Sequence, residues 1–221
     1  MLIGYLVLVK LALTALPGVL RSPAQAKVFE WPLLALWAAL GSAGIWLSER
    51  TGFAPAWEPG TARSRLLTPA LWGFGFGALA VATDLATGWT KWVAAKLGVA
   101  SIHIPWPESL LIYPGGAIIV EILYRLFAIP LLLWLISSIA LRGRRQEAVF
   151  WALAVLTSIA EPVGDLGLRV LGWGTMAAVF AQDYALNFAQ AWFFRKRGFL
   201  AAITMRVAFY LVWHVLGGLR G

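Results

Sequence analysis

Long apolar runs separated by short polar stretches dominate the chain. A helix needs about 20 mostly apolar residues to cross a bilayer, because backbone amides in hydrocarbon must bond to one another. Seven runs approach or exceed that length, and they cover residues 2–20, 28–47, 69–89, 110–141, 148–163, 170–194 and 199–219. The pattern predicts an all-α, polytopic membrane helix bundle with about seven transmembrane helices, within a range of six to eight.

Two runs depart from a simple span. The first carries Lys10 but has no positively charged segment before it, so it predicts a retained helix rather than a signal peptide. Lys10 is expected to snorkel toward the membrane surface. The fourth run is too long for one straight crossing, and Pro114 and Pro130 predict breaks or kinks within it. No low-complexity segment or internal repeat divides the chain, so residues 1–221 are predicted to form a single integral membrane domain.

Composition supports this assignment. Hydrophobic residues make up 61% of the chain and charged residues 13%, which excludes both a soluble globular domain and a disordered chain. Cysteine is absent from the sequence, and this excludes disulfides, thiolate metal sites and a thiol nucleophile. Many of the 13 Trp residues lie near predicted span ends, as in the aromatic belts of membrane proteins.

The net charge of +8 reflects topology rather than nucleic-acid binding. Basic residues gather at 142–145 and 195–197, and seven crossings place both clusters, with Arg50, Arg63 and Arg65, on one side of the bilayer. The excess of Lys and Arg predicts that this side is cytoplasmic, with the amino terminus inside and the carboxyl terminus outside. The lipid bilayer and other membrane proteins are the expected partners, and nucleic acid is not.

Polar residues inside the apolar runs are the candidates for function, because charges in a membrane span cost several kcal/mol unless they are paired. Glu121 and Arg125 are four residues apart and share a helix face. The same spacing rule groups two further stripes on later helices. The stripes consist of Asp183, Asn187 and Gln190, and of Arg206, Tyr210 and His214. We expect all three stripes to face a common centre.

Two segments resemble a known family. Residues 113–127 read Tyr-Pro-Gly-Gly-Ala-Ile-Ile-Val-Glu-Ile-Leu-Tyr-Arg-Leu-Phe. This resembles the first motif of the CPBP family, the CAAX prenyl protease and bacteriocin-processing (Abi) membrane proteins, which reads Gly-Gly, two or three residues, then Glu-Glu-x-x-x-Arg. The stretch from Leu186 to His214, with its basic turn, Gly198 and small-residue helix, is similar to the family's closing segment. The resemblance implies a CAAX-protease-like core at 113–219, in a bacterial cytoplasmic (inner) membrane.

The chain departs from the family at the catalytic positions. The resemblance implies that the first Glu of the family motif activates a water for attack on a peptide bond, aided by His residues from two later helices. Here Val120 stands at that Glu position, while Glu121 and Arg125 match the second Glu and the Arg. The middle motif, Phe-x-x-x-His, aligns with 157–161 and replaces its His by Glu161. The last His aligns with Arg206 and its Asp or Asn partner with Tyr210.

These replacements predict an inactive, neutralised centre. Val and Arg cannot act as general bases, and Arg206 would repel a metal cation, so no metal or other cofactor is predicted. The large apolar surface is compatible with contacts to lipid or pigment. We expect a buried polar network of ion pairs, Glu121 with Arg125 and Glu161 with Arg206. Further candidate members are Asp183, Asn187 and His214.

Simpler structural roles compete with this hypothesis. Glu121 and Arg125 could serve only as a tie between helices, and Glu161 could lie in water at a helix end. Asp183 and Asn187 are expected to act as interhelical hydrogen-bond partners rather than as a proton relay. His214 is expected to bond a neighbour, and His103 to lie in a loop. The stretch Gly73-Phe-Gly75-Phe-Gly77 predicts close helix packing, because it lacks the context of a nucleotide site.

Three functions fit the sequence. The first is a catalytically silent relative of the CAAX proteases that acts as a scaffold, binder or accessory subunit of a membrane assembly. The second is an active intramembrane endopeptidase that uses Glu121 and Glu161, with Asp183 and His214 as further acid-base groups. The third is a lipid-binding or transport protein, which the lack of inverted repeats disfavours. The loss of the family's base and histidines favours the first, non-enzymatic function.

Overall fold

The structure, a computed structural model, describes residues 1–15, 26–56, 58–59, 61–165 and 172–219. This part of the chain is helical throughout and contains no strand. The α-helices are α1 (Leu2–Ala15), α3 (Trp31–Arg50), α4 (Thr68–Thr87), α5 (Trp89–Leu97), α6 (Ser109–Glu121), α7 (Ile129–Leu133), α8 (Gln146–Asp165), α9 (Trp173–Arg197) and α10 (Phe199–Tyr210). Four π-helical segments join or extend them, at Arg63–Leu67, Ile122–Ala128, Trp134–Ala140 and Leu211–Leu216.

Four of the described helices are long and apolar enough to cross a membrane, and the all-helical prediction is confirmed to that extent. They are Trp31–Arg50, Arg63–Thr87, Ser109–Ala140 and Phe199–Leu216. Helix α1 is apolar but has only 14 residues, and the predicted end of its run, 16–20, lies outside the described residues. Helices α8 and α9 are long, but their polar residues keep them out of this set. The start of the sixth run, 170–171, also lies outside the described part of the chain.

The long apolar run at 110–141 forms one continuous helical rod of 32 residues, Ser109–Ala140. Of the predicted breaks or kinks, a break is excluded, because the chain stays helical through Pro114 and Pro130. Pro130 falls in the first turn of α7, directly after the π-helical segment, where a missing backbone N–H removes little. The wider π-helical turns on either side of α7 absorb the irregularity that the proline pattern predicted as a break.

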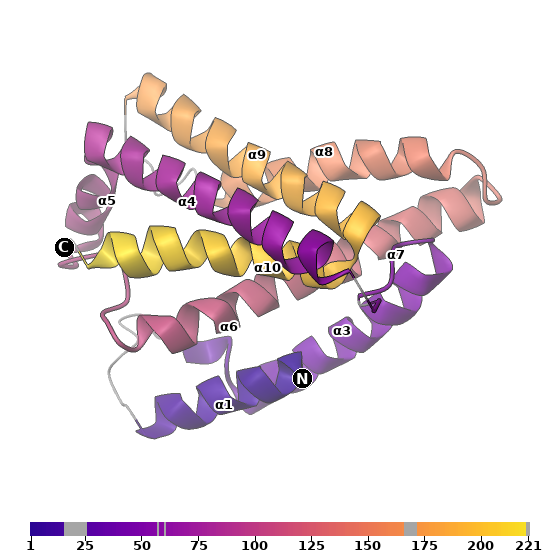
Figure 1. Cartoon of the computed structure of the whole chain (residues 1–221), viewed down its shortest axis with the longest axis horizontal. Coiled ribbons are helices and arrows are strands. Elements are labelled where there is room, and N and C mark those ends of the chain that lie inside the picture. Colours follow the sequence, from indigo (N-terminus) through magenta and orange to yellow (C-terminus); the bar gives the residue numbers. More distant parts are fainter. Residues whose placement is uncertain (16–25, 57, 60, 166–171, 220–221) are drawn as a thin grey trace.

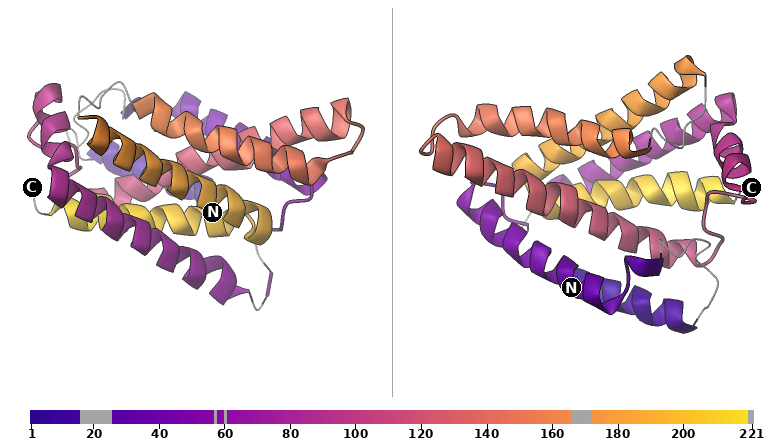
Figure 2. Two further views of the ribbon diagram at one scale, coloured as in Figure 1. Left: turned by 90° about the horizontal axis from the view of Figure 1, so that it is seen from above. Right: turned by 180° about the vertical axis from the view of Figure 1, so that it is seen from behind.

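Consecutive long helices run in alternating directions, as Figures 1 and 2 show. The basic segments meet at one end of the bundle. Arg195, in the last turn of α9, donates hydrogen bonds to the carbonyl of Thr51 at the end of α3 (2.8 Å) and to Glu147 in the first turn of α8 (2.9 Å). The bond from Arg195 also lowers the pKa of the Glu147 carboxyl. Short helix α5 and the loop to α6 lie at the opposite end.

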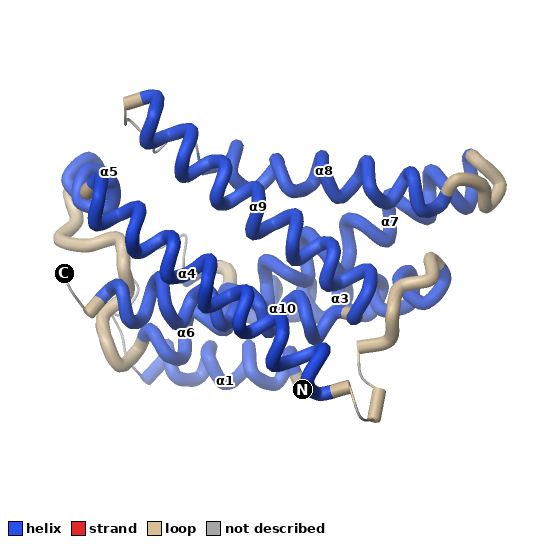
Figure 3. Tube along the Cα trace, turned by 45° about the horizontal axis from the view of Figure 1, so that its top comes forward, coloured by secondary structure: helices blue, strands red, loops and turns tan. Residues whose placement is uncertain are grey.

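Helix α10 lies between α4, α9 and α6 in the middle of the bundle (Figure 3). The approach of α4 depends on glycine. A Cβ at Gly73 would lie 2.2 Å from the Met205 carbonyl oxygen, and one at Gly77 would lie 2.6 Å from the Val212 Cβ. Gly75 between them has no neighbour within 4 Å. The interpretation of this stretch as a close-packing motif is confirmed.

Lys10 does not stand alone. Its ammonium lies 2.9 Å from the Glu30 carboxylate, and its side chain is 13% exposed. The ion pair ties α1 to the residue before α3, so Lys10 has an acidic partner that the sequence pattern did not indicate. An acidic residue just before one helix can thus neutralise a positive charge within a neighbouring apolar helix.

Adding one methyl group at Gly73 should therefore destabilise the protein, whereas the same change at Gly75 should not. Gly73→Ala forces α4 away from α10, and overpacking of this kind typically costs about 1–3 kcal/mol. Gly75→Ala is the matched control, since alanine favours helix by up to about 1 kcal/mol over glycine. Thermal unfolding in detergent, followed by tryptophan fluorescence, measures both. Equal shifts for the two variants would contradict the packing described here.

Candidate functional site

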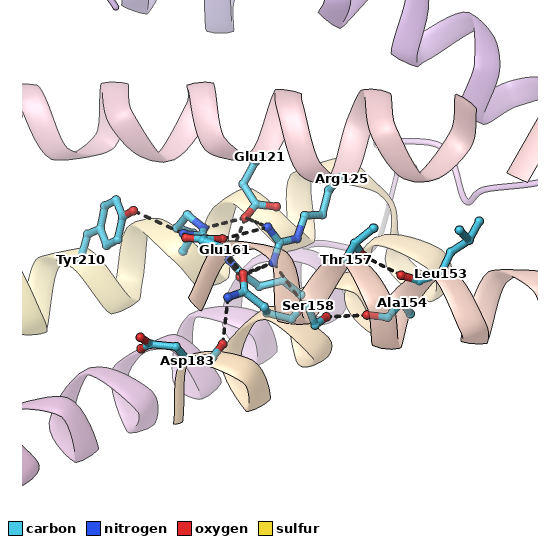
Figure 4. A network of polar contacts seen from close by, with 12 residues as sticks. Glu121, Arg125, Leu153, Ala154, Thr157, Ser158, Glu161, Asp183 and Tyr210 are labelled. Atoms are coloured by element: carbon cyan, nitrogen blue, oxygen red, sulfur yellow. Dashed lines mark hydrogen bonds and ion pairs between the residues drawn. The ribbon is translucent and has the colours of Figure 1, made fainter. Parts of the chain in front are cut away.

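Four helical elements bring their polar stripes to one buried point (Figure 4). Glu121 ends α6 and Arg125 follows one turn later, in the π-helical segment. Glu161 comes from α8, and Arg206 from α10. Helix α9 contributes two amides, Asn187 and Gln190, which lie three residues apart on one face. Except for Glu161, each of these side chains is almost fully buried.

Arg206 is the centre of the network. Its Nε donates to Glu121 Oε1 at 2.6 Å. Its two terminal nitrogens form a bidentate pair with the Glu161 carboxylate, at 2.7 and 2.9 Å. Nη2 also donates to Asn187 Oδ1 (2.8 Å) and Gln190 Oε1 (2.9 Å). A guanidinium with its donors shared among two carboxylates and two amides is fully satisfied, and charge-assisted bidentate pairs are the strongest of these contacts.

Arg125 plays a second, looser role. Its Nη1 lies 3.3 Å from Glu161 Oε2 and 3.9 Å from Glu121 Oε1. Its Nη2 donates to Asn187 Oδ1 and, at 3.3 Å, to Gln190 Oε1. The expected partner of Glu121 was its helical neighbour, but Arg206 and the Gln190 amide (2.9 Å) hold Glu121 more closely. The shortest contacts of Glu121 are thus with residues of other helices, and Arg125, four residues along its own helix, lies farther away.

The charges of the cluster balance. Two guanidinium groups face two carboxylates, and each charged group contacts at least one of opposite sign. Among the buried side-chain nitrogen and oxygen atoms of the described residues, Glu121 Oε2 alone has no hydrogen-bond partner. Only 23% of the Glu161 side chain is exposed, and both of its carboxylate oxygens accept hydrogen bonds from Arg206. The structure therefore does not show Glu161 free in water at a helix end. Tyr210 adds its hydroxyl 3.3 Å from Arg206 Nη1.

Asp183 and His214 lie along a neighbouring cavity of about 160 Å³ that Glu161 and Tyr210 also line. Figure 4 shows the Asp183 carboxylate turned away from the ion pairs, while its backbone carbonyl accepts a hydrogen bond from Asn187 (2.8 Å). His214 contacts His103, with 3.2 Å between their Nδ1 atoms, and stacks on Tyr113. These two members of the predicted network therefore border the cluster.

Sequence reasoning missed specific contacts across helices. Gln190 was expected on a polar stripe that faces the centre but was not named in the ion-pair network, and it bonds Glu121 and both arginines. His103 lies in a loop as expected, yet it reaches a residue 111 positions away, which no local pattern indicates. Burial lowers the pKa of the His103 imidazole, against an opposing effect of Asp84. The imidazole is therefore neutral near pH 7.

The described residues do not form a metal centre, and the cavity beside the cluster is small. Within the described ranges no three His, Cys, Asp or Glu side chains gather as a metal site would require. The cavity of about 160 Å³ is small beside the 300–1,000 Å³ of typical ligand pockets. Val120, one residue before Glu121, is partly buried and adds no acid-base group to the site. The arrangement ties α6, α8, α9 and α10 together through buried ion pairs and hydrogen bonds.

Searches of family models, curated proteins and solved structures return no match for this chain.

Replacing Arg206 with Met should strongly destabilise the fold. The variant leaves two carboxylates buried without their main partner, and breaking a buried pair in this way costs about 3–5 kcal/mol. Lys196→Met is the control, because its ion pair with Glu147 is half exposed and such pairs contribute about 0–1 kcal/mol. Chemical or thermal unfolding in detergent compares the two. An Arg206→Met protein as stable as the parent would argue against the network.

Proposed function

We propose that this protein is a catalytically silent relative of the CAAX-type membrane proteases that serves as a scaffold or accessory subunit of a membrane assembly. One observation carries the proposal. Arg206, at the position of the family's last His, donates to both Glu121 and Glu161. Because one cation is bonded to both acidic groups, they form a closed ion-pair cluster. Neither group is then free to act as the base that hydrolysis needs.

The state of the carboxylates supports this function. A general base must accept a proton from a water poised for attack, and it needs an accessible lone pair. Both Glu161 oxygens accept from guanidinium groups, and Glu121 Oε1 accepts from Arg206 and Gln190. The remaining oxygen, Glu121 Oε2, is fully buried. A peptide substrate would have to enter a cavity of about 160 Å³ to reach this cluster.

The same proposal includes seven crossings in a bacterial cytoplasmic membrane. Apart from short α5, the helical rods of the described residues alternate in direction, which supports the additional crossings by α1, α8 and α9. The gathering of Arg and Lys around Arg195 at one end supports a cytoplasmic location for that end. The amino terminus is then inside and the carboxyl terminus outside.

An endopeptidase is the second candidate, because Glu121 Oε2 has no hydrogen-bond partner among the described residues. A water bound there would be the nucleophile of such an enzyme.

A cleavage assay separates the two functions. The purified protein is incubated with a prenylated peptide and with a transmembrane peptide, and products are followed by mass spectrometry. We expect no turnover above the level of Glu161→Gln, because neither carboxylate is available as a base. Turnover that Glu121→Gln or Glu161→Gln abolishes, in variants that remain folded, would establish the endopeptidase instead.

A scaffold or subunit should also keep its partner on gentle extraction. We expect the chain, purified from its native membranes in mild detergent, to carry a companion protein in fixed stoichiometry. Quantitative mass spectrometry of a size-exclusion peak measures the ratio. The control is the same preparation in a harsh detergent, which should separate the two. A chain that elutes alone under both conditions would count against the accessory role.

A further inference from the structure

The loop that joins α5 to α6 is tied to the end of the α10 rod by a contact between two histidines. His103, in the middle of this loop (98–108), has its Nδ1 3.2 Å from the Nδ1 of His214. The His103 ring also meets the Trp213 ring edge to face, with 5.3 Å between the centroids. Packing is tight here, since a Cβ at Gly218 would lie 3.0 Å from the His103 Cβ. The loop is therefore held against the helical segment that carries His214.

Tyr113 of α6 supports both sides of this contact. Its ring stacks on His214, with 4.2 Å between the centroids. Its hydroxyl accepts a hydrogen bond of 2.8 Å from the backbone N–H of Ile104, the residue directly after His103. One side chain thus sets the distance between the loop and the helix, and the two imidazoles meet between aromatic rings.

The histidine contact lies between two cavities. His103 lines an outer cavity of about 480 Å³ at the end of the bundle where α5 lies (Figure 1). His214 lines the inner cavity of about 160 Å³ beside the ion pairs. Ile102 and Trp213 line both, so the two cavities are neighbours. The loop therefore forms part of the wall between them, and moving His103 away would join them.

Two neutral imidazoles can make this contact, whereas two charged ones cannot. A neutral ring carries one N–H, so one Nδ1 donates while the other accepts. Protonation of the accepting ring places a hydrogen on both Nδ1 atoms, which then repel each other. Burial lowers the pKa of the His103 imidazole, and the charge of Asp84 opposes this effect only in part. The contact is therefore made at neutral pH and is lost as the pH falls.

Charged and titratable groups face the pair from the surrounding helices. Besides Tyr113, they are Asp84 of α4, Lys91 of α5, Glu161 of α8, Asp183 of α9, and Arg206 and Tyr210 of α10. Three carboxylates against two cations leave these surroundings mildly favourable to an imidazolium once water can reach it.

We propose that His103 and His214 form a pH-sensitive latch, which closes the inner cavity on the side of the outer one while both rings are neutral and opens it to water when they take up protons. Opening admits water and small polar solutes to Glu161, whose side chain is 23% exposed. The latch does not rest on the proposed function, because it concerns access to the cavity and not the state of the ion pairs.

Cysteine labelling tests the latch, because the parent sequence has no cysteine. Ala80→Cys places a thiol in the inner cavity, and Ala95→Cys places the reference thiol on the exposed face of α5. The rates of reaction with a small water-soluble pyridyl disulfide are measured in detergent, and their ratio cancels the pH dependence of the thiol. At about pH 5.5 a freely exposed histidine, with an ordinary pKa of about 6.5, is protonated about ten times as often as it is neutral. We therefore expect the ratio to rise about tenfold between about pH 7.5 and about pH 5.5.

Two replacements of His103 separate the latch from general loosening. His103→Ala removes the contact, so the labelling ratio should be high at both pH values. His103→Asn keeps a polar group at the position of Nδ1, and an amide can donate to a neutral ring or accept from a charged one. The ratio should then stay low at both pH values. Ser158→Cys, which is buried in α8 and lines neither cavity, should remain unreactive throughout.

Four results would each overturn the proposal. The first is a labelling ratio for Ala80→Cys that does not change with pH, and the second is a ratio at neutral pH that His103→Ala does not raise. The third is a pH response in His103→Asn as large as that of the parent. The fourth is labelling of Ser158→Cys in acid as fast as that of Ala80→Cys, which would mean that the whole bundle loosens.

Discussion

The guanidinium of Arg206 between the carboxylates of Glu121 and Glu161 is the interaction on which the rest of the structure depends. A lone charge at this depth would cost several kcal/mol, and its removal would leave two others unpaired. The polar stripes of α6, α8, α9 and α10 therefore have to meet at one level. The ion pairs set the register of the four helices, while apolar packing supplies most of the stabilisation.

Helix packing and the charged cluster depend on each other. Gly73 brings α4 against the carbonyl of Met205, the residue directly before Arg206. The same contact fixes the depth of α10, and with it the position of the guanidinium. Gly44 of α3 likewise allows α3 to approach the long helix Ser109–Ala140 closely, since a Cβ at Gly44 would lie 2.4 Å from the Leu126 carbonyl oxygen. Residues without side chains thus determine where the charged side chains meet.

Local patterns predicted the helices and the faces of the polar stripes, because hydrophobic length and four-residue spacing are properties of a single segment. They could not predict partners across helices. Glu121 was expected to pair mainly with Arg125 on its own helix, yet Arg206, 85 residues away, lies closer. The role of Gln190 and the contact between His103 and His214 depend on tertiary packing in the same way. Pro130 failed as a break signal because π-helical turns accommodate it.

A double-mutant cycle on Glu161 and Arg206 tests the central claim most directly. The free energy of unfolding in detergent is measured for the parent, Glu161→Gln, Arg206→Met and the double variant. If the two groups neutralise each other, the double variant should lose less than the sum of the single losses, with a coupling of at least about 1.5 kcal/mol. Losses that add to within about 0.5 kcal/mol would mean that the two side chains are independent, and the account of a closed ion-pair network would be wrong.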